Sequence, residues 1–163
     1  MRIFNTKFGF TLIESLVYIG IFGVFFITVV QFTLNVQESN LNANHRKLIS
    51  TNSMYVSNYL QDSFNNSTTV NNSVSVFDNT NGVLRIENGT DFFEFRLSNN
   101  ILVVNKNGVE FQLLYDDVIV NSFKVEKVLD TASQISGIRI SINYVSLKKT
   151  AITLALTTMY YLK

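Results

Sequence analysis

The chain has 163 residues, of which 47% are apolar and 15% charged, and its formal net charge is +1. This length corresponds to one domain, the apolar fraction excludes a disordered tail, and the near-neutral balance gives no indication of DNA binding. With no cysteine and a single histidine, the chain has no disulfide or thiol nucleophile and too few ligands for most transition-metal sites. We therefore expect neither metal nor cofactor, and no enzyme.

A short basic leader, residues 1–9, precedes a long apolar stretch. The leader carries Arg2 and Lys7 and no acid, whereas residues 10–30 contain one charge, Glu14. A helix of about 20 apolar residues spans the ~30 Å hydrocarbon core of a membrane. Positive charge before the stretch favours a cytoplasmic N-terminus. We expect a single-pass membrane protein whose C-terminal part lies outside.

The apolar stretch does not fit a cleaved secretory signal or an ordinary anchor. A secretory signal has an apolar region of about 7 to 15 residues that ends at small residues, and no such site follows here. Gly9 instead precedes the stretch, so cleavage there would leave the helix on the mature protein. An ordinary anchor does not explain Glu14, because a carboxylate at the centre of a membrane helix costs about 2.5 to 3.5 kcal/mol.

Cleavage between Gly9 and Phe10 would provide a partner for this carboxylate. The new amine of Phe10 would lie one helical turn before Glu14, on the same face of the helix. The Glu14 carboxylate could pair with this amine or with the amine of a neighbouring subunit. A pair between subunits would also fix their axial stagger, because an unpaired charge in an apolar bundle is penalised.

The segment GFTLIES at residues 9–15, after a short basic leader, resembles the N-terminal signature of type IV prepilins and of the pseudopilins of type II secretion and DNA-uptake systems. The resemblance implies that a prepilin peptidase cuts after Gly9, that Phe10 becomes the N-methylated first residue, and that Glu14 is the assembly glutamate. It implies as partners other pilin or pseudopilin subunits, the peptidase, the inner-membrane assembly platform and the lipids of a bacterial cytoplasmic membrane. The mature protein would then enter a periplasmic or cell-surface filament.

One departure from many pilins is that this helix contains no proline. Helix flexibility would then come from Gly20 and Gly23, each of which costs about 1 kcal/mol relative to alanine in a helix. The same glycines could instead allow close helix packing in the membrane. Both interpretations favour a helix that bundles with others.

Apolar residues continue at helical spacing beyond residue 30, although polar residues become frequent. The spacing predicts one helix over residues 11–62. Residues 10–34 form its transmembrane and assembly half, and residues 35–62 form an amphipathic half that packs on a head domain. His45 falls on the apolar face of this second half without a neighbouring ligand, so we assign it no role.

Residues 63–163 are expected to form a β-rich globular head. Asn-Gly pairs at residues 81–82, 88–89 and 107–108 are typical of tight hairpin turns. Runs rich in β-branched and aromatic residues predict strands, which we place at residues 83–87, 91–97, 101–105, 109–115, 118–129, 135–145 and 151–162. Apolar and charged residues alternate along these strands, so one face of the meander is apolar and must be buried by another element. The fold class is therefore α+β, with a long helix packed on an antiparallel β-rich head, as in pilins.

These observations favour a structural subunit of a type IV pilus or a type II secretion-like pseudopilus. The two groups of strands resemble the minor class of subunits. The alternative is a single-pass membrane-anchored extracellular binding module, which would retain residues 1–9 and would not depend on Glu14.

Overall fold

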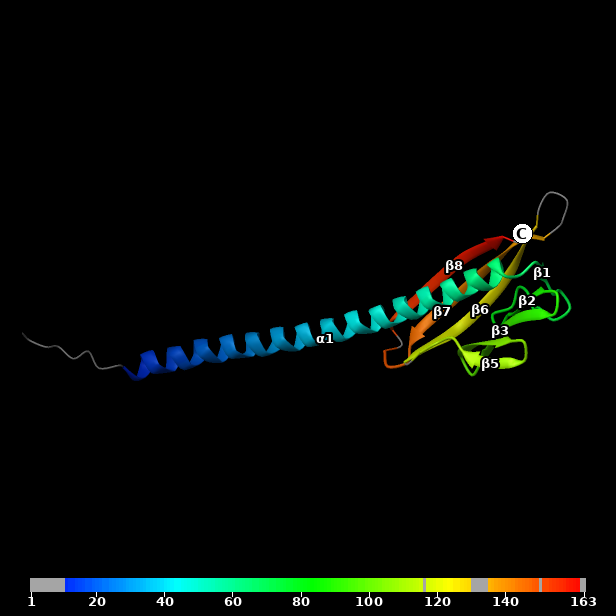
Figure 1. Ribbon diagram of the computed structural model, residues 1–163. Coiled ribbons are helices and arrows are strands. Elements are labelled where there is room, and N and C mark those ends of the chain that lie inside the picture. The colour runs from blue at the N-terminus through cyan, green and yellow to red at the C-terminus, as the bar shows by residue number, and fades with distance from the viewer. Residues whose placement is uncertain (1–10, 116, 130–134, 150, 162–163) are drawn as a thin grey trace, which may run out of the picture. The chain divides into compact units, whose positions relative to one another are not determined.

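The computed structural model describes residues 11–115, 117–129, 135–149 and 151–161 (Figure 1). In these residues a long helix, α1 (Leu12–Asn65), precedes two antiparallel sheets. The first sheet has the order β1 (Thr69–Val70), β2 (Val83–Asn88), β3 (Asp91–Ser98), β4 (Ile101–Lys106) and β5 (Val109–Gln112). The second has the order β6 (Val118–Leu129), β7 (Ile135–Ser146) and β8 (Thr153–Tyr161). The expected α+β fold class is confirmed.

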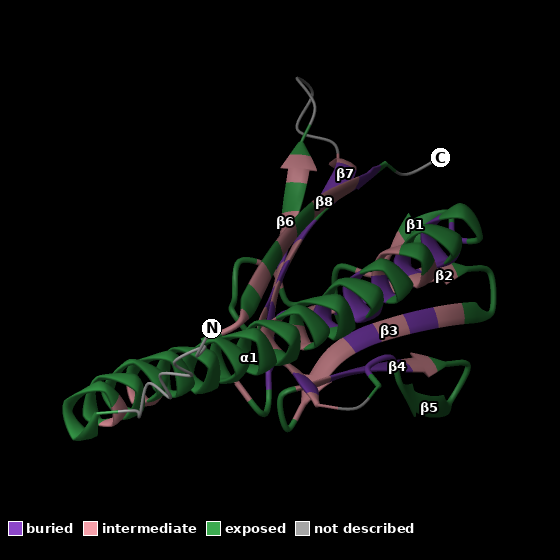
Figure 2. Ribbon diagram, turned by 90° about the vertical axis from the view of Figure 1, so that its left-hand side faces the viewer, coloured by how far each residue is buried: buried purple, intermediate pink, exposed green. Residues whose placement is uncertain are grey.

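The chain divides into two compact units, Met1–Leu41 and Asn42–Lys163. Within the second unit, the end of α1 packs on the sheets. Its buried residues are Ile49, Asn52, Ser53, Val56, Leu60, Ser63 and Phe64. They recur at helical spacing, and in Figure 2 the buried colour on α1 is confined to this part of the helix.

Aromatic contacts join this end of α1 to both sheets. Phe64 stacks on Tyr160 of β8, with ring centroids 4.6 Å apart and planes inclined by 2°. Tyr59 meets the edges of Phe93 and Phe95 of β3, at 6.4 and 6.1 Å between centroids. Such pairs stabilise by about 0.5 to 1.5 kcal/mol beyond the burial of their area. The helix therefore supplies the cover that the apolar face of the meander needs.

A buried amide adds a polar connection between α1 and the segment after β5. The Asn52 side chain donates to the carbonyl of Leu48 at 2.9 Å and accepts the backbone N–H of Tyr115 at 2.8 Å. Both bonds are needed because a buried amide without partners is costly. The second bond lies just past the end of β5, which ends at Gln112 rather than continuing to residue 115 as expected.

The segment before β2 joins the two sheets. The N–H of Gly82 donates to the carbonyl of Phe123 in β6 at 2.7 Å, and the N–H of Phe123 donates to the carbonyl of Thr80 at 2.8 Å. A Cβ on Gly82 would lie 2.8 Å from the carbonyl oxygen of Phe123. The prediction of a hairpin turn at residues 81–82 is therefore wrong. Gly82 has no side chain, and this allows the two backbone segments to approach closely.

The other turns follow the expectation in part. Asn107 and Gly108 both have positive φ, 52° and 90°, as a tight hairpin turn of this type requires. Asn99 and Asn100 also have positive φ, 49° and 62°, and connect β3 to β4. Asparagine tolerates this conformation better than other non-glycine residues.

Gly82→Ala is expected to lower the free energy of unfolding by about 1 to 3 kcal/mol, because the methyl group must displace backbone on one side of the joint. Chemical unfolding of the full chain in detergent micelles, followed by tyrosine fluorescence, measures the change. Asn81→Ala is the control, since the Asn81 side chain is exposed. Equal stability of the two variants would contradict the close approach at Gly82.

Candidate functional site

The first turn of α1 contains a helix-capping arrangement. The N–H of Glu14 donates to the Thr11 hydroxyl at 3.3 Å, and the N–H of Ser15 donates to the Thr11 carbonyl at 3.1 Å. Thr-x-x-Glu is the spacing of a capping box, and a carboxylate near the positive end of the helix dipole is stabilising. The Thr11 hydroxyl thus caps the first turn, and Glu14 occupies the position from which a carboxylate completes such a box. This capping signal could have been read from the sequence, and the expectation above missed it.

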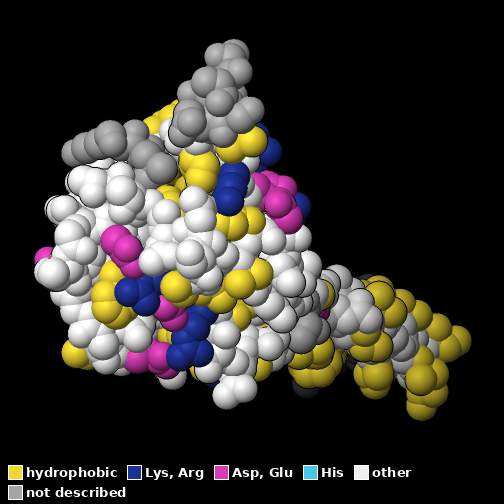
Figure 3. All heavy atoms as spheres, turned by 90° about the vertical axis from the view of Figure 1, so that its right-hand side faces the viewer, with side chains coloured by type: hydrophobic (Ala, Val, Ile, Leu, Met, Phe, Trp, Pro, Cys, Tyr) yellow, Lys and Arg dark blue, Asp and Glu magenta, His cyan; other side chains and the backbone are white. Residues whose placement is uncertain are grey.

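The turns that follow expose apolar side chains in every direction. All the large apolar residues from residue 12 to residue 30 are exposed, and in Figure 3 hydrophobic side chains predominate at the end of α1 away from the head. Helix α1 contains a stretch that is long and apolar enough to cross a membrane, and none of that stretch is buried within the chain. An apolar surface of this extent requires a cover of lipid or of other helices.

Two threonine hydroxyl groups in the first half of α1 have partners one turn away. The hydroxyl groups of Thr28 and Thr33 each donate to the carbonyl one turn earlier, of Val24 and Val29, at 2.9 Å. Such bonds give a hydroxyl side chain a hydrogen-bond partner in an apolar environment that contains no water.

Contacts among the described residues explain neither Gly20 nor Gly23. Apart from the adjoining residues and the backbone of its own helix, a Cβ at either position would meet no described heavy atom within 4 Å, and α1 continues through both residues. The two predicted reasons for these glycines, helix flexibility and close packing with another helix, both stay predictions.

The remaining expected residues of the processing site, Arg2, Lys7, Gly9 and Phe10, lie outside the described residues. The pairing of the Phe10 amine with Glu14 therefore stays a prediction.

The histidine lies beside a buried serine. His45 Nδ1 is 3.2 Å from the hydroxyl of Ser146, and Ser146 is 1% exposed. The Ser146 hydroxyl also accepts the N–H of Lys149 at 3.3 Å. The described residues contain no group of three or more His, Asp or Glu side chains that could hold a metal ion.

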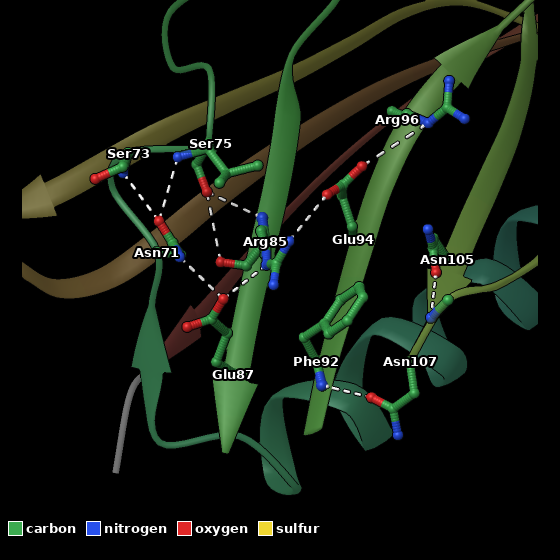
Figure 4. Close-up of polar contacts among 12 residues, drawn as sticks. Asn71, Ser73, Ser75, Arg85, Glu87, Phe92, Glu94, Arg96, Asn105 and Asn107 are labelled. Carbon is green, nitrogen blue, oxygen red and sulfur yellow. Dashed lines mark hydrogen bonds and ion pairs between the residues drawn. The ribbon is translucent and has the colours of Figure 1, made fainter. Parts of the chain in front are cut away.

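Charged residues on the outer face of the first sheet form a chain of ion pairs (Figure 4). Arg85 lies 2.6 Å from Glu87 and 3.7 Å from Glu94, and Arg96 contacts both Glu94 and Glu110. Side chains of opposite sign also lie next to each other on the face shown in Figure 3. Because positive and negative groups alternate, this cluster links the strands across the sheet and presents no field of a single sign to a ligand.

Acid is expected to weaken the head through Glu87. A hydrogen bond from Asn71 and then one from Arg85 lower the pKa of Glu87. A pKa that is lower in the folded than in the unfolded chain gives stability that is present above the unfolded pKa of about 4.3 and lost as the pH falls through the folded pKa. The urea midpoint should therefore fall below about pH 4.3, and Glu87→Gln should reduce this acid dependence. Identical pH profiles for the two proteins would contradict the assignment.

A shallow groove of about 530 Å³ lies beside α1 in the head. Its lining includes Lys47, Leu48, Tyr55 and Tyr115. The rings of Tyr55 and Tyr115 meet edge to face at 5.5 Å between centroids. A hydrogen bond to Tyr115 and partial burial raise the pKa of Tyr55.

Comparison with known proteins identified no relative. No model of a protein family matches the chain, and neither the curated proteins nor the solved structures contain a match.

Proposed function

We propose that the chain is a structural subunit, of the minor class, of a type IV pilus or a type II secretion-like pseudopilus. The observation that carries the proposal is the position of Glu14. This carboxylate belongs to the prepilin-like segment at residues 9–15. It lies in the first turn of a helix whose following turns are apolar and exposed on all sides.

The physical requirements of this helix support a role in assembly. Its apolar surface would be covered first by the lipids of the cytoplasmic membrane and then by the helices of neighbouring pilin subunits in a filament. Glu14 would need a cation in either environment. A prepilin peptidase would release the amine of Phe10, and this amine would supply the cation, either within the same chain or to a neighbouring subunit. The inner-membrane assembly platform would help the cleaved subunit to enter the filament.

The intact mass and N-terminal fragment spectrum of the protein from its native membrane test this proposal. Loss of residues 1–9 together with one added methyl group on Phe10 is the expected result. A chain that still begins at Met1 would contradict the proposal.

The second candidate is a membrane-anchored extracellular binding module. The groove beside Tyr55 and Tyr115 favours it, because aromatic faces with a polar rim are common in ligand sites. Under this alternative the chain would keep residues 1–9. Replacing Glu14 would leave its localisation and ligand binding unchanged, whereas Tyr115→Ala would reduce binding.

A further inference from the structure

Among the residues that the structure describes, one sheet edge in the head is long and unprotected. β1, at one edge of the first sheet, has two residues, and the outer edge of β6 is covered by residues 78–82 through backbone hydrogen bonds. β8 has nine residues, TLALTTMYY, with no charge and no proline. Soluble proteins normally protect such an edge with charges, proline or a bulge, because its free backbone groups pair readily with another strand.

The hydrogen-bond pattern identifies the free groups of β8. The N–H of Ser146 donates to the carbonyl of Ile152 at 3.1 Å, and β7 and β8 pair without a register shift. Because hydrogen-bonded pairs alternate in an antiparallel ladder, the N–H and C=O groups of Thr153, Ala155 and Thr157 point away from β7. Among the described residues, no backbone hydrogen bond from another element reaches these three.

The second open edge is β5, whose four residues are all exposed. The N–H of Leu113 donates to the carbonyl of Leu102 at 2.9 Å, and β4 and β5 pair without a shift. The same alternation turns the backbone groups of Glu110 and Gln112 outward. In Figure 1, β8 and β5 lie on opposite sides of the end of α1.

The two open edges run in opposite directions. At the start of β8, Leu154 lines the same hollow as Ile49 of α1, and near its end Tyr160 stacks on Phe64. β8 therefore runs in the direction of α1. In β5, Phe111 meets Tyr59, and the chain then leads back to Tyr115, which meets Tyr55. β5 therefore runs against α1. Two heads with parallel helices can join β8 of one to β5 of the other as an antiparallel pair.

The faces of the two strands also match. On the side towards α1, β5 carries Val109 and Phe111, which are 67% and 36% exposed, and β8 carries the half-buried Leu154 and Leu156. A β8–β5 joint would place these apolar side chains next to each other and keep polar side chains on the opposite face. Joining β8 to β8 would instead either reverse one helix or place the apolar faces on opposite sides of the sheet.

We propose that β8 of one copy of this chain adds to β5 of the next copy. This contact is heterologous, so it leaves one open edge at each end and can continue into a series. It rests on the proposed function, because anchoring in one membrane is what makes the helices parallel. Two adjacent copies are sufficient for it.

Disulfide cross-linking tests the contact directly, because the natural chain has no cysteine. Full-length Thr157→Cys and Gln112→Cys chains, with different tags, are expressed together in the native host and oxidised in the membrane. A disulfide requires Cα atoms about 4.4 to 6.8 Å apart. A second pair, Ala155→Cys with Gln112→Cys, therefore tests the pairing of β8 with β5 in a register shifted by two residues. We expect at least tenfold more mixed-tag dimer than with Thr90→Cys, an exposed control in the β2–β3 turn. A chain carrying both Thr157→Cys and Gln112→Cys should give trimers and larger species.

A charge on the β8 edge provides the second measurement. Ala155 is exposed, so Ala155→Lys should preserve the thermal unfolding midpoint and reduce the Thr157→Cys to Gln112→Cys cross-link at least tenfold. Thr90→Lys should not reduce it. A cross-link no stronger than the control, or a Thr157→Cys chain that cross-links efficiently to itself, would overturn the contact.

The same membranes separate this inference from the proposed function. A chain that has lost residues 1–9 but gives no cross-link would defeat the contact alone. A chain that retains residues 1–9 would defeat the proposed function, whatever the cross-linking result.

Discussion

Glu14→Ala is expected to leave cleavage after Gly9 and membrane insertion intact and to reduce incorporation into filaments at least tenfold. Without the carboxylate, the positive terminus of a neighbouring subunit loses its partner in an apolar bundle. The cost of a charge at the centre of a membrane helix, about 2.5 to 3.5 kcal/mol, exceeds the 1.4 kcal/mol that corresponds to a tenfold change. Quantitative immunoblotting of sheared filaments against the membrane fraction measures incorporation.

Glu14→Gln separates the two roles of this residue. The backbone N–H of Glu14 donates to the Thr11 hydroxyl, and glutamine suits this position of a capping box as well as glutamate does. A loss of incorporation with both glutamine and alanine would assign the role to the charge. Glu38→Gln, which removes an acid from α1 outside residues 10–34, is the matched control and should incorporate normally. Normal incorporation of Glu14→Ala would remove the assembly role from this residue.

Phe64→Ala is expected to lower the free energy of unfolding of the head by about 3 to 5 kcal/mol, the usual range for removal of a buried aromatic ring. Phe64 is 3% exposed and stacks on Tyr160. Its loss would leave a cavity between the last turn of α1 and β8 and would remove a contact between the helix and the second sheet.

Chemical unfolding of the full chain in detergent micelles, followed by tyrosine fluorescence, measures this change. Met54→Ala is the matched control, because Met54 lies on the exposed side of the same helix at 65% exposure. Its effect should stay within about 0.5 kcal/mol. A Phe64→Ala variant as stable as this control would contradict the packing of α1 on β8.

Sequence periodicity predicted most of the fold because the signals are local. The expected helix at residues 11–62 is α1, Leu12–Asn65, and the expected strand at residues 135–145 is β7, Ile135–Ser146. Three-and-four spacing along a helix and alternation along a strand depend on which face is buried. They are therefore visible before any long-range contact is known.

Features set by long-range contacts were not predicted. Gly82 has the dipeptide of a hairpin turn, but its role depends on Phe123 in another sheet. Asn52 resembles any polar helix residue until its bond to Tyr115 is known. For the candidate site, the motif at residues 9–15 indicated Glu14, and Thr11 carried a local capping signal as well. Neither signal specifies which surfaces of the head meet a neighbour, because that depends on how the strand edges are arranged in space.

The order of strands in the sheets has a consequence for how the head folds. In the described residues, hydrogen-bonded strands within each sheet are consecutive in the chain, so each new strand can pair with the one synthesised just before it, without closing a long loop. The stack of Phe64 on Tyr160 is different, because it joins the end of α1 to the last strand. The apolar face of α1 in the head is synthesised before the strands, and its burial is complete only when β8 has formed. A nascent or truncated chain that lacks β8 therefore exposes this face to chaperones and proteases.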